Sequence, residues 1–125
     1  MRRLATIAVI AALLGLVGCI TPSIPIPPPD PARMTFNVTV VDLKSSAVFA
    51  YPIEHNYKNG IAYLYDRTLR GGVIHDVNPD DSIGPIGLPA SLGDQVVVSV
   101  QVGDQTISTC VVLREGAQDP NSYCQ

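Results

Sequence analysis

The sequence predicts an all-β fold, a small β-sandwich of about seven strands over residues 34–125. Strict alternation of apolar and polar residues in segment 34–40 is typical of a half-buried strand, and segment 95–113 has the pattern of a hairpin around a two-residue turn. Turn signals rich in Gly, Pro and Asn separate the short apolar runs between these segments. No stretch after Cys19 keeps the 3.6-residue period of a helix. About seven short strands in about 92 residues favour a sandwich over a closed barrel.

The chain opens with the layout of a secretory signal peptide. Arg2 and Arg3 precede an apolar run that starts at Leu4, and the small residue Gly18 stands directly before Cys19. The alternative is an uncleaved transmembrane anchor, but a run of about fifteen residues is shorter than the roughly 20 that a spanning helix needs. The prolines that follow Cys19 prevent a helix from extending further.

The segment Leu16-Val17-Gly18-Cys19 resembles the lipobox of bacterial lipoproteins. The resemblance implies that the thiol of Cys19 is joined to a diacylglycerol and that residues 1–18 are then removed. Cys19 would become the lipidated first residue of the mature chain and hold it to the cell membrane or outer membrane, on the extracytoplasmic face.

Residues 20–31 have the composition of a polyproline II segment. We expect residues 19–33 to form a semi-rigid tether that does not pack and that holds the domain about 35–40 Å from the bilayer. The alternative is that the Pro-rich run is a ligand for an aromatic groove.

The expected strands follow in order along the domain. Segment 34–40 places Met34, Phe36, Val38 and Val40 on one face. Strands are then expected at 47–51 and, after an Asn59-Gly60 turn, at 61–65. Segment 68–77 predicts a further strand, broken near Gly71-Gly72. Residues 78–94 contain many Gly and Pro residues and are interpreted as a loop with a short extended piece at 83–88.

The Gly103-Asp104 turn between runs 95–102 and 105–113 predicts a hairpin with a defined register. If Val102 faces Gln105, the apolar face pairs Val100 with Ile107, Val98 with Thr109 and Val96 with Val111. The opposite face then pairs Gln101 with Thr106, Ser99 with Ser108 and Val97 with Cys110. Cys110 is therefore expected to point away from the main core.

Charge excludes one class of partner. With residues 1–18 removed, six basic and eleven acidic side chains remain, which is a net charge of −5. A chain of this sign has no electrostatic basis for binding nucleic acid. Anionic lipid head groups also attract it little, so the acyl chains on Cys19 would have to carry the membrane attachment.

The three cysteines are expected to have two different roles. With Cys19 taken by lipid, Cys110 and Cys124 remain in an oxidising compartment, where a disulfide persists. Such a bridge closes a loop of about 15 residues and stabilises the fold by about 3 kcal/mol in the chain-entropy model. The alternative is a metal site, which needs further ligands that are not near in the sequence.

The late strand Ile107–Val112 with its cysteine, followed by Tyr123-Cys124, resembles the end of the MmpS-type accessory proteins of mycobacterial membranes. The resemblance implies a small immunoglobulin-like β-sandwich outside the membrane, and the matched residues are Cys110 and Cys124 alone. That family keeps an uncleaved N-terminal helix and partners large lipid exporters, whereas this chain has a lipobox and a proline spacer.

Few residues carry the chemistry of a catalytic or metal site. His55 and His75 each have a carboxylate as sequence neighbour, but adjacent strand residues point to opposite faces. Asp76, Asn78 and Asp80 provide oxygens at alternate positions, as at the start of a Ca²⁺ loop, and the match then fails, with Asp81 where a glycine is needed. A turn with solvated acids is the simpler interpretation. No cofactor and no enzymatic activity are predicted.

Tyr63 and Tyr65 lie two residues apart and share one strand face. Core packing with the hydroxyls at the rim is the simpler interpretation. The alternative is that they are the binding residues for an envelope protein or component. Two other functions stay open, an accessory or carrier for an apolar ligand and an inhibitor or exclusion lipoprotein that acts on a cell-wall hydrolase or a phage. A carrier needs a cavity of about 300 Å³ or more between the sheets.

Overall fold

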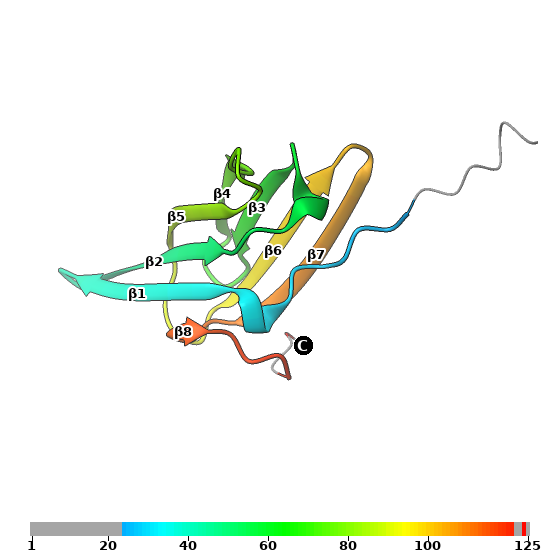
Figure 1. The fold of residues 1–125 in the computed structure, drawn as a ribbon. Helices are drawn as coiled ribbons and strands as arrows, with labels where there is room; N and C mark the ends of the chain where they lie inside the picture. The colour runs from blue at the N-terminus through cyan, green and yellow to red at the C-terminus, as the bar shows by residue number, and fades with distance from the viewer. Residues whose placement is uncertain (1–23, 122–123, 125) are drawn as a thin grey trace, which may run out of the picture.

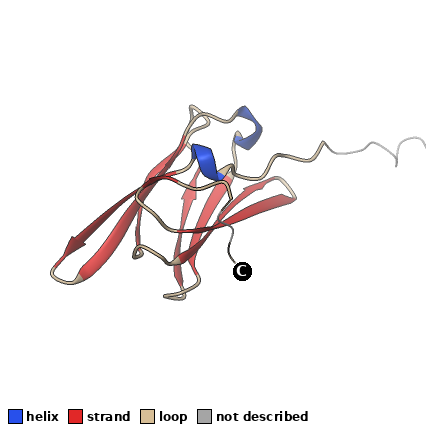
Figure 2. Cartoon of the chain, turned by 90° about the horizontal axis from the view of Figure 1, so that it is seen from below, coloured by secondary structure: helices blue, strands red, loops and turns tan. Residues whose placement is uncertain are grey.

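The computed structural model describes residues 24–121 and Cys124. Two four-stranded antiparallel sheets pack face to face as a sandwich (Figures 1 and 2). The strands are β1 (Thr35–Val41), β2 (Lys44–Tyr51), β3 (Ile61–Asp66), β4 (Gly71–Asp76), β5 (Ile83–Pro89), β6 (Gln95–Val102), β7 (Gln105–Val112) and β8 (Gly116–Ala117). Two short 3-10 helices are η1 (Pro31–Arg33) and η2 (His55–Tyr57). The predicted all-β sandwich is confirmed.

The strand order is immunoglobulin-like. One sheet runs β5-β2-β1-β8 and the other β4-β3-β6-β7. The first, second and fifth strands therefore share one sheet, and the third, sixth and seventh share the other, as strands A, B, E and C, F, G do in immunoglobulin domains. β4 pairs with β3, which is the place of strand C′ in the variable-type arrangement.

The β6–β7 hairpin has the predicted register along its whole length. Val102 pairs with Gln105, and Val96 pairs with Val111. Val96, Val98 and Val100 are buried, because alternate residues of β6 face the opposite sheet. Cys110 pairs with Val97 on the outer face, as the alternation requires.

The β1–β2 hairpin extends beyond the sandwich core (Figure 1). Its turn residues Asp42 and Leu43 both adopt left-handed backbone conformations, with φ of 51° and 66°. Phe36 is buried, whereas Val40 is 67% exposed. The apolar face of segment 34–40 is therefore covered only in its first half, since Val38 is half-buried and the exposed Val40 lies beyond the core.

β5 corrects the interpretation of residues 78–94 as mainly loop. Its seven residues pair with β2, and Ile83, Ile86 and Leu88 are buried between the sheets. β5 is an edge strand, where a proline costs no ladder hydrogen bond on the free side. The register shifts between Phe49 and Tyr51 of β2, which accommodates the Gly-Pro pair.

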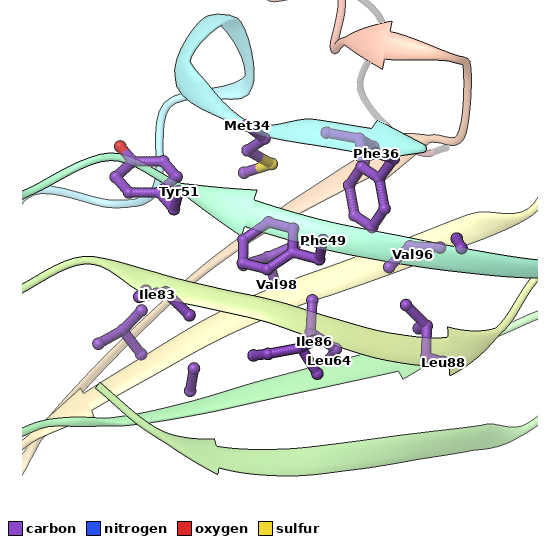
Figure 3. Close-up of a cluster of buried hydrophobic side chains, with 14 of the residues drawn as sticks. Met34, Phe36, Phe49, Tyr51, Leu64, Ile83, Ile86, Leu88, Val96 and Val98 are labelled. Carbon is purple, nitrogen blue, oxygen red and sulfur yellow. The ribbon is translucent and has the colours of Figure 1, made fainter. Parts of the chain in front are cut away.

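Aromatic and branched side chains from both sheets fill the core (Figure 3). Phe36 of β1 and Phe49 of β2 lie with ring centroids 5.1 Å apart, and both are fully buried. They face Leu64 of β3 and Val98 of β6, which come from the other sheet and are also buried. The space between the sheets is therefore occupied by the protein's own side chains.

The Pro-rich segment packs on the domain over residues 24–33, which corrects the expected tether. Pro29 and Pro31 are buried, and η1 leads directly into the buried Met34. Asp30 caps η1, since its side chain accepts a hydrogen bond from the amide of Ala32. The folded unit therefore begins before residue 34.

Candidate functional site

The predicted binding residues lie on the outer face of the β4-β3-β6-β7 sheet. Tyr63 pairs with Ile74 of β4, and Tyr65 pairs with Val97 of β6. Because alternate strand residues share a face, all four side chains point away from the core. We call these four residues the tyrosine face.

The members of the tyrosine face differ in exposure. The hydroxyl of Tyr63 donates a 2.8 Å hydrogen bond to Oε1 of Gln101, and its ring is half-buried. Tyr65 is 44% exposed and Ile74 is 70% exposed. Local alternation identified the tyrosines, but Ile74 and Val97 become their neighbours only through strand pairing.

Tyr65 also has a structural role, because its ring lies beside Gly72. A Cβ atom at position 72 would lie 3.3 Å from Cδ2 of Tyr65 and would collide with the carbonyl oxygen of Leu64. Gly72 is directly opposite Tyr65 in the β3–β4 ladder. An aromatic ring that covers a glycine of an edge strand protects the ladder there.

The Cys110–Cys124 disulfide lies on the same sheet, at its β7 edge. The two Cα atoms are 5.4 Å apart, and the disulfide prediction is confirmed. The amide of Cys124 donates to the carbonyl of Cys110, which shows that this carbonyl points away from β6. Nη1 of Arg67 lies 3.9 Å from Sγ of Cys110 and brings a cation to the same region.

The tail reaches Cys124 past a fully buried amide, Gln118. Its backbone amide donates to the carbonyl of Met34, and its Nε2 donates to the carbonyls of Arg114 and Gly116. β8, which comes just before it, pairs with β1. These contacts hold the tail on the β1 edge before it crosses to β7.

The Pro-rich segment forms a second site that the sequence interpretation missed. We call residues 24–31 the strap. The side chain of Gln105 accepts from the amide of Ile26, at 3.0 Å, and donates to the carbonyl of Ile24, at 3.1 Å. The hydroxyl of Tyr57 donates to the carbonyl of Pro27, at 2.8 Å. Burial raises the pKa of Tyr57, so its hydroxyl stays protonated and remains a donor.

Two further contacts hold the C-terminal half of the strap. Oγ1 of Thr109 donates a 2.5 Å hydrogen bond to the carbonyl of Pro29, and the hydroxyl of Tyr51 accepts from the amide of Asp30. Pro28 to Pro31 and the β7 residues 108 and 109 line a groove of about 370 Å³. All five contacts go to backbone atoms of the strap.

An ion pair follows directly after the strap. Nη1 of Arg33 lies 2.8 Å from Oε2 of Glu54, and its guanidinium carbon lies 5.1 Å from the ring centroid of Tyr51. Nη2 of Arg33 donates to the carbonyl of Ile53. The hydrogen bond from Arg33 lowers the pKa of Glu54. This pair fixes the end of β2 to the segment that enters β1.

The candidate Ca²⁺ residues are used in a turn. Oδ1 of Asp80 accepts from both the amide and the hydroxyl of Ser82, which lowers the pKa of Asp80. Nδ2 of Asn78 donates to Ser82 and to the carbonyl of Gly84, and Asp76 is exposed on β4. Among residues 24–121 and 124, no group of three or more His, Cys, Asp or Glu side chains could hold a metal ion.

The histidines make local contacts. Nδ1 of His55 lies 2.8 Å from Oδ2 of Asp81, and the Glu54 amide donates to the carbonyl of Asp81, so this pair fixes η2 to the loop before β5. Nδ1 of His75 contacts the carbonyl of Asp76. Neither histidine hydrogen-bonds a Ser, Thr or Cys side chain within the described part of the chain.

The signal peptide, the lipobox Leu16–Cys19 and Tyr123 lie outside the described residues. Among the residues that are described, no helix has the length and apolar character to cross a bilayer. Comparisons of the chain with protein-family models, with curated proteins and with solved structures found no match.

Proposed function

We propose that this chain is an extracytoplasmic, lipid-anchored and non-enzymatic protein that binds a protein or another component of the cell envelope. The anchor rests on Cys19 and its lipobox. The binding role rests on the tyrosine face, where Tyr65 and Ile74 are exposed side by side with the ring of Tyr63. Aromatic side chains are enriched at protein interfaces, which supports this assignment.

The position of the tyrosine face on the sheet favours recognition. Its strands are paired on both sides at β3 and β6, so the side chains are held on a rigid support. The opposite face of the same sheet is packed by buried residues such as Leu64 and Val98. Binding therefore costs little ordering of the backbone, which leaves more of the contact energy for affinity.

The anchor is tested by metabolic labelling with a fatty acid. Wild-type cells should yield a labelled chain, and a Cys19→Ser variant should yield an unlabelled one that keeps its signal segment. Equal labelling of the two chains would refute the lipid anchor. Mass determination of the mature chain gives the cleavage site independently.

The binding role is tested by photo-crosslinking in intact cells from a reactive residue placed at Tyr65. A second change, Ile74→Lys, should abolish the crosslinked product, because a charge replaces an exposed apolar contact. Val48→Lys is the matched control, since Val48 is an exposed apolar strand residue on the other sheet. Loss of the product in both variants, or in neither, would refute the assignment to the tyrosine face.

The alternative of an apolar-ligand carrier has no support in the described structure. Phe36, Phe49 and Leu64 occupy the space between the sheets, where such a ligand would bind. The groove of about 370 Å³ lies outside the sandwich, beside the strap. Prolines of the strap and the hydroxyl residues Ser108 and Thr109 of β7 line it, so it is not a space between the two sheets.

A further inference from the structure

The strap shortens the chain that is free between the membrane and the domain. Its first held residue is Ile24, which is five residue steps from Cys19. At about 3.1 Å per residue, five residue steps reach about 15 Å. If the whole segment up to Met34 were free, fifteen steps would span about 45 Å.

The strap also defines which end of the sandwich lies nearest to Cys19. Ile24 is held by Gln105, the first residue after the Gly103-Asp104 turn of the β6–β7 hairpin. The β1–β2 turn lies at the other end of the molecule, as both views show (Figures 1 and 2). β1 has seven residues and therefore spans about 23 Å. This length exceeds the about 15 Å that the five residue steps from Cys19 to Ile24 can reach, so the β1–β2 turn lies beyond the reach of this chain segment.

The distal end has an unusual surface. Leu43 is 99% exposed, and Val40 and Val41 are each 67% exposed. Leu43 is held in the left-handed backbone conformation, which a leucine rarely adopts. If the strap docks, these apolar side chains point away from the bilayer that holds the lipid.

We propose that the end of the sandwich with the β6–β7 turn is a membrane-facing surface, held against the lipid bilayer by the docked strap, with the β1–β2 turn directed outward. Gln105 and Tyr57 act as the latch, because they bind the part of the strap that is otherwise exposed. This proposal rests on the lipid anchor at Cys19 proposed above. In this arrangement residues 19–33 do not act as a long spacer, and the domain lies close to the bilayer in one orientation.

The test uses the lipidated chain purified from cells and reconstituted in phosphatidylethanolamine–phosphatidylglycerol vesicles that contain a spin-labelled lipid as quencher. One fluorophore is placed at the membrane-facing turn by Asp104→Cys, and another at the distal turn by Lys44→Cys. Both positions are exposed. We expect quenching of the label at 104 to exceed quenching at 44 by at least about twofold, because about 15 Å of free chain keeps only the first end near the lipid.

The latch is tested by replacing residues 24–28 with Gly-Ser-Gly-Ser-Gly, which keeps the chain length. Quenching at 104 should then fall at least about twofold toward the value at 44, because the chain is free up to Pro29, ten residue steps from Cys19, which reach about 30 Å. Ile24→Ala is the matched control. It removes only an 85% exposed side chain and keeps the carbonyl that Gln105 binds, so quenching should match the wild type.

The outcomes separate the two proposals. If the chain from cells carries no lipid, the proposed anchor fails and the membrane-facing surface is overturned with it. If the chain is lipidated but the two labels are quenched equally, only the oriented contact is overturned. The oriented contact is also overturned if the Gly-Ser variant keeps the wild-type difference in quenching between positions 104 and 44. Amide exchange of Ile26 in a Cys19→Ser chain gives a readout without a membrane, and Gln105→Ala should accelerate it because the acceptor of that amide is lost.

Discussion

Asp66 and Asp94 bring two carboxyl groups together inside the sandwich, where β3 ends and β6 begins. Asp66 is fully buried and Asp94 is 7% exposed. Oδ1 of Asp66 accepts from the amides of Thr68 and Leu69, whereas its buried Oδ2 has no hydrogen-bond partner in the described structure. Burial, together with the neighbouring carboxyl of Asp94, raises the pKa of Asp66. Protonation of Asp66 removes the cost of holding its charge in this buried position.

This pair predicts a stability that falls as pH rises. The pKa of Asp66 in the folded state lies above its value in the unfolded chain, so the folded state holds a proton that the unfolded chain releases. The stabilising contribution is therefore complete below about pH 4 and is lost as pH rises through the folded pKa. Urea unfolding of the wild type at a series of pH values measures this loss.

Asp66→Asn should remove the contribution of Asp66 to the pH dependence of stability. An asparagine keeps the oxygen that accepts from Thr68 and Leu69, and its amide donates to the carboxylate of Asp94. We expect the variant to be about 1–2 kcal/mol more stable than the wild type at pH 7, with a smaller difference at pH 4. Asp66→Ala, which loses both hydrogen bonds, should be less stable at both pH values. The gain in free energy of unfolding from Asp66→Asn should be larger at pH 7 than at pH 4. A gain that is larger at pH 4 would contradict the raised pKa of Asp66.

The disulfide predicts a second effect on stability. The change Cys110→Ser/Cys124→Ser should lower the free energy of unfolding by about 3 kcal/mol, because it releases a closed loop of about 15 residues. The fold should persist, since Gln118 still holds the tail to Met34. Wild type reduced with dithiothreitol should match the double variant in urea unfolding. Equal stability of oxidised and reduced wild type would show that the bridge contributes nothing.

Local patterns predicted the parts of the fold that depend on a period of two. The β6–β7 register follows from the two-residue turn at Gly103-Asp104, because a slip by one residue would turn Val98 and its neighbours to solvent. For the same reason Tyr63 and Tyr65 share one face, whereas only the structure shows that this face is the outer one. Ile74 was not assigned to that face, because the pairing of β4 with β3 is not contained in the local sequence.

The strap could not be predicted from local sequence. Its contacts with Gln105 and Thr109 join residues about 80 positions apart, and the proline composition alone is typical of a free linker. β5 was obscured by a related effect. Pro85 and Gly87 are exposed on an edge strand, so they signal a loop although Ile86 and Leu88 are buried.

The strap contact at Pro29 gives a third prediction. Thr109→Val keeps the size of the side chain but removes the hydroxyl that donates to the buried carbonyl of Pro29. An unpaired buried carbonyl costs about 1–3 kcal/mol, which urea unfolding would detect. Thr106→Val on the same strand is the control, because Thr106 is exposed and its change should stay within about 0.5 kcal/mol. Similar losses for both variants would show that the strap contact is not specific.

Neighbouring glycines in β4 provide the last prediction. A Cβ at position 72 would collide with the carbonyl oxygen of Leu64 and would lie 3.2 Å from Cα of Tyr65, both of which are backbone atoms that cannot move aside cheaply. At Gly71 nothing lies within 4 Å of the added atom. Gly72→Ala should therefore lower the free energy of unfolding by about 1–3 kcal/mol through strain in the β3–β4 ladder. Gly71→Ala should leave it unchanged or raise it by up to about 1 kcal/mol, because alanine restricts the unfolded chain. Equal effects in urea unfolding would mean that the close approach of β4 to Tyr65 does not exist in solution, and the tyrosine face would lose the support that positions its most exposed ring.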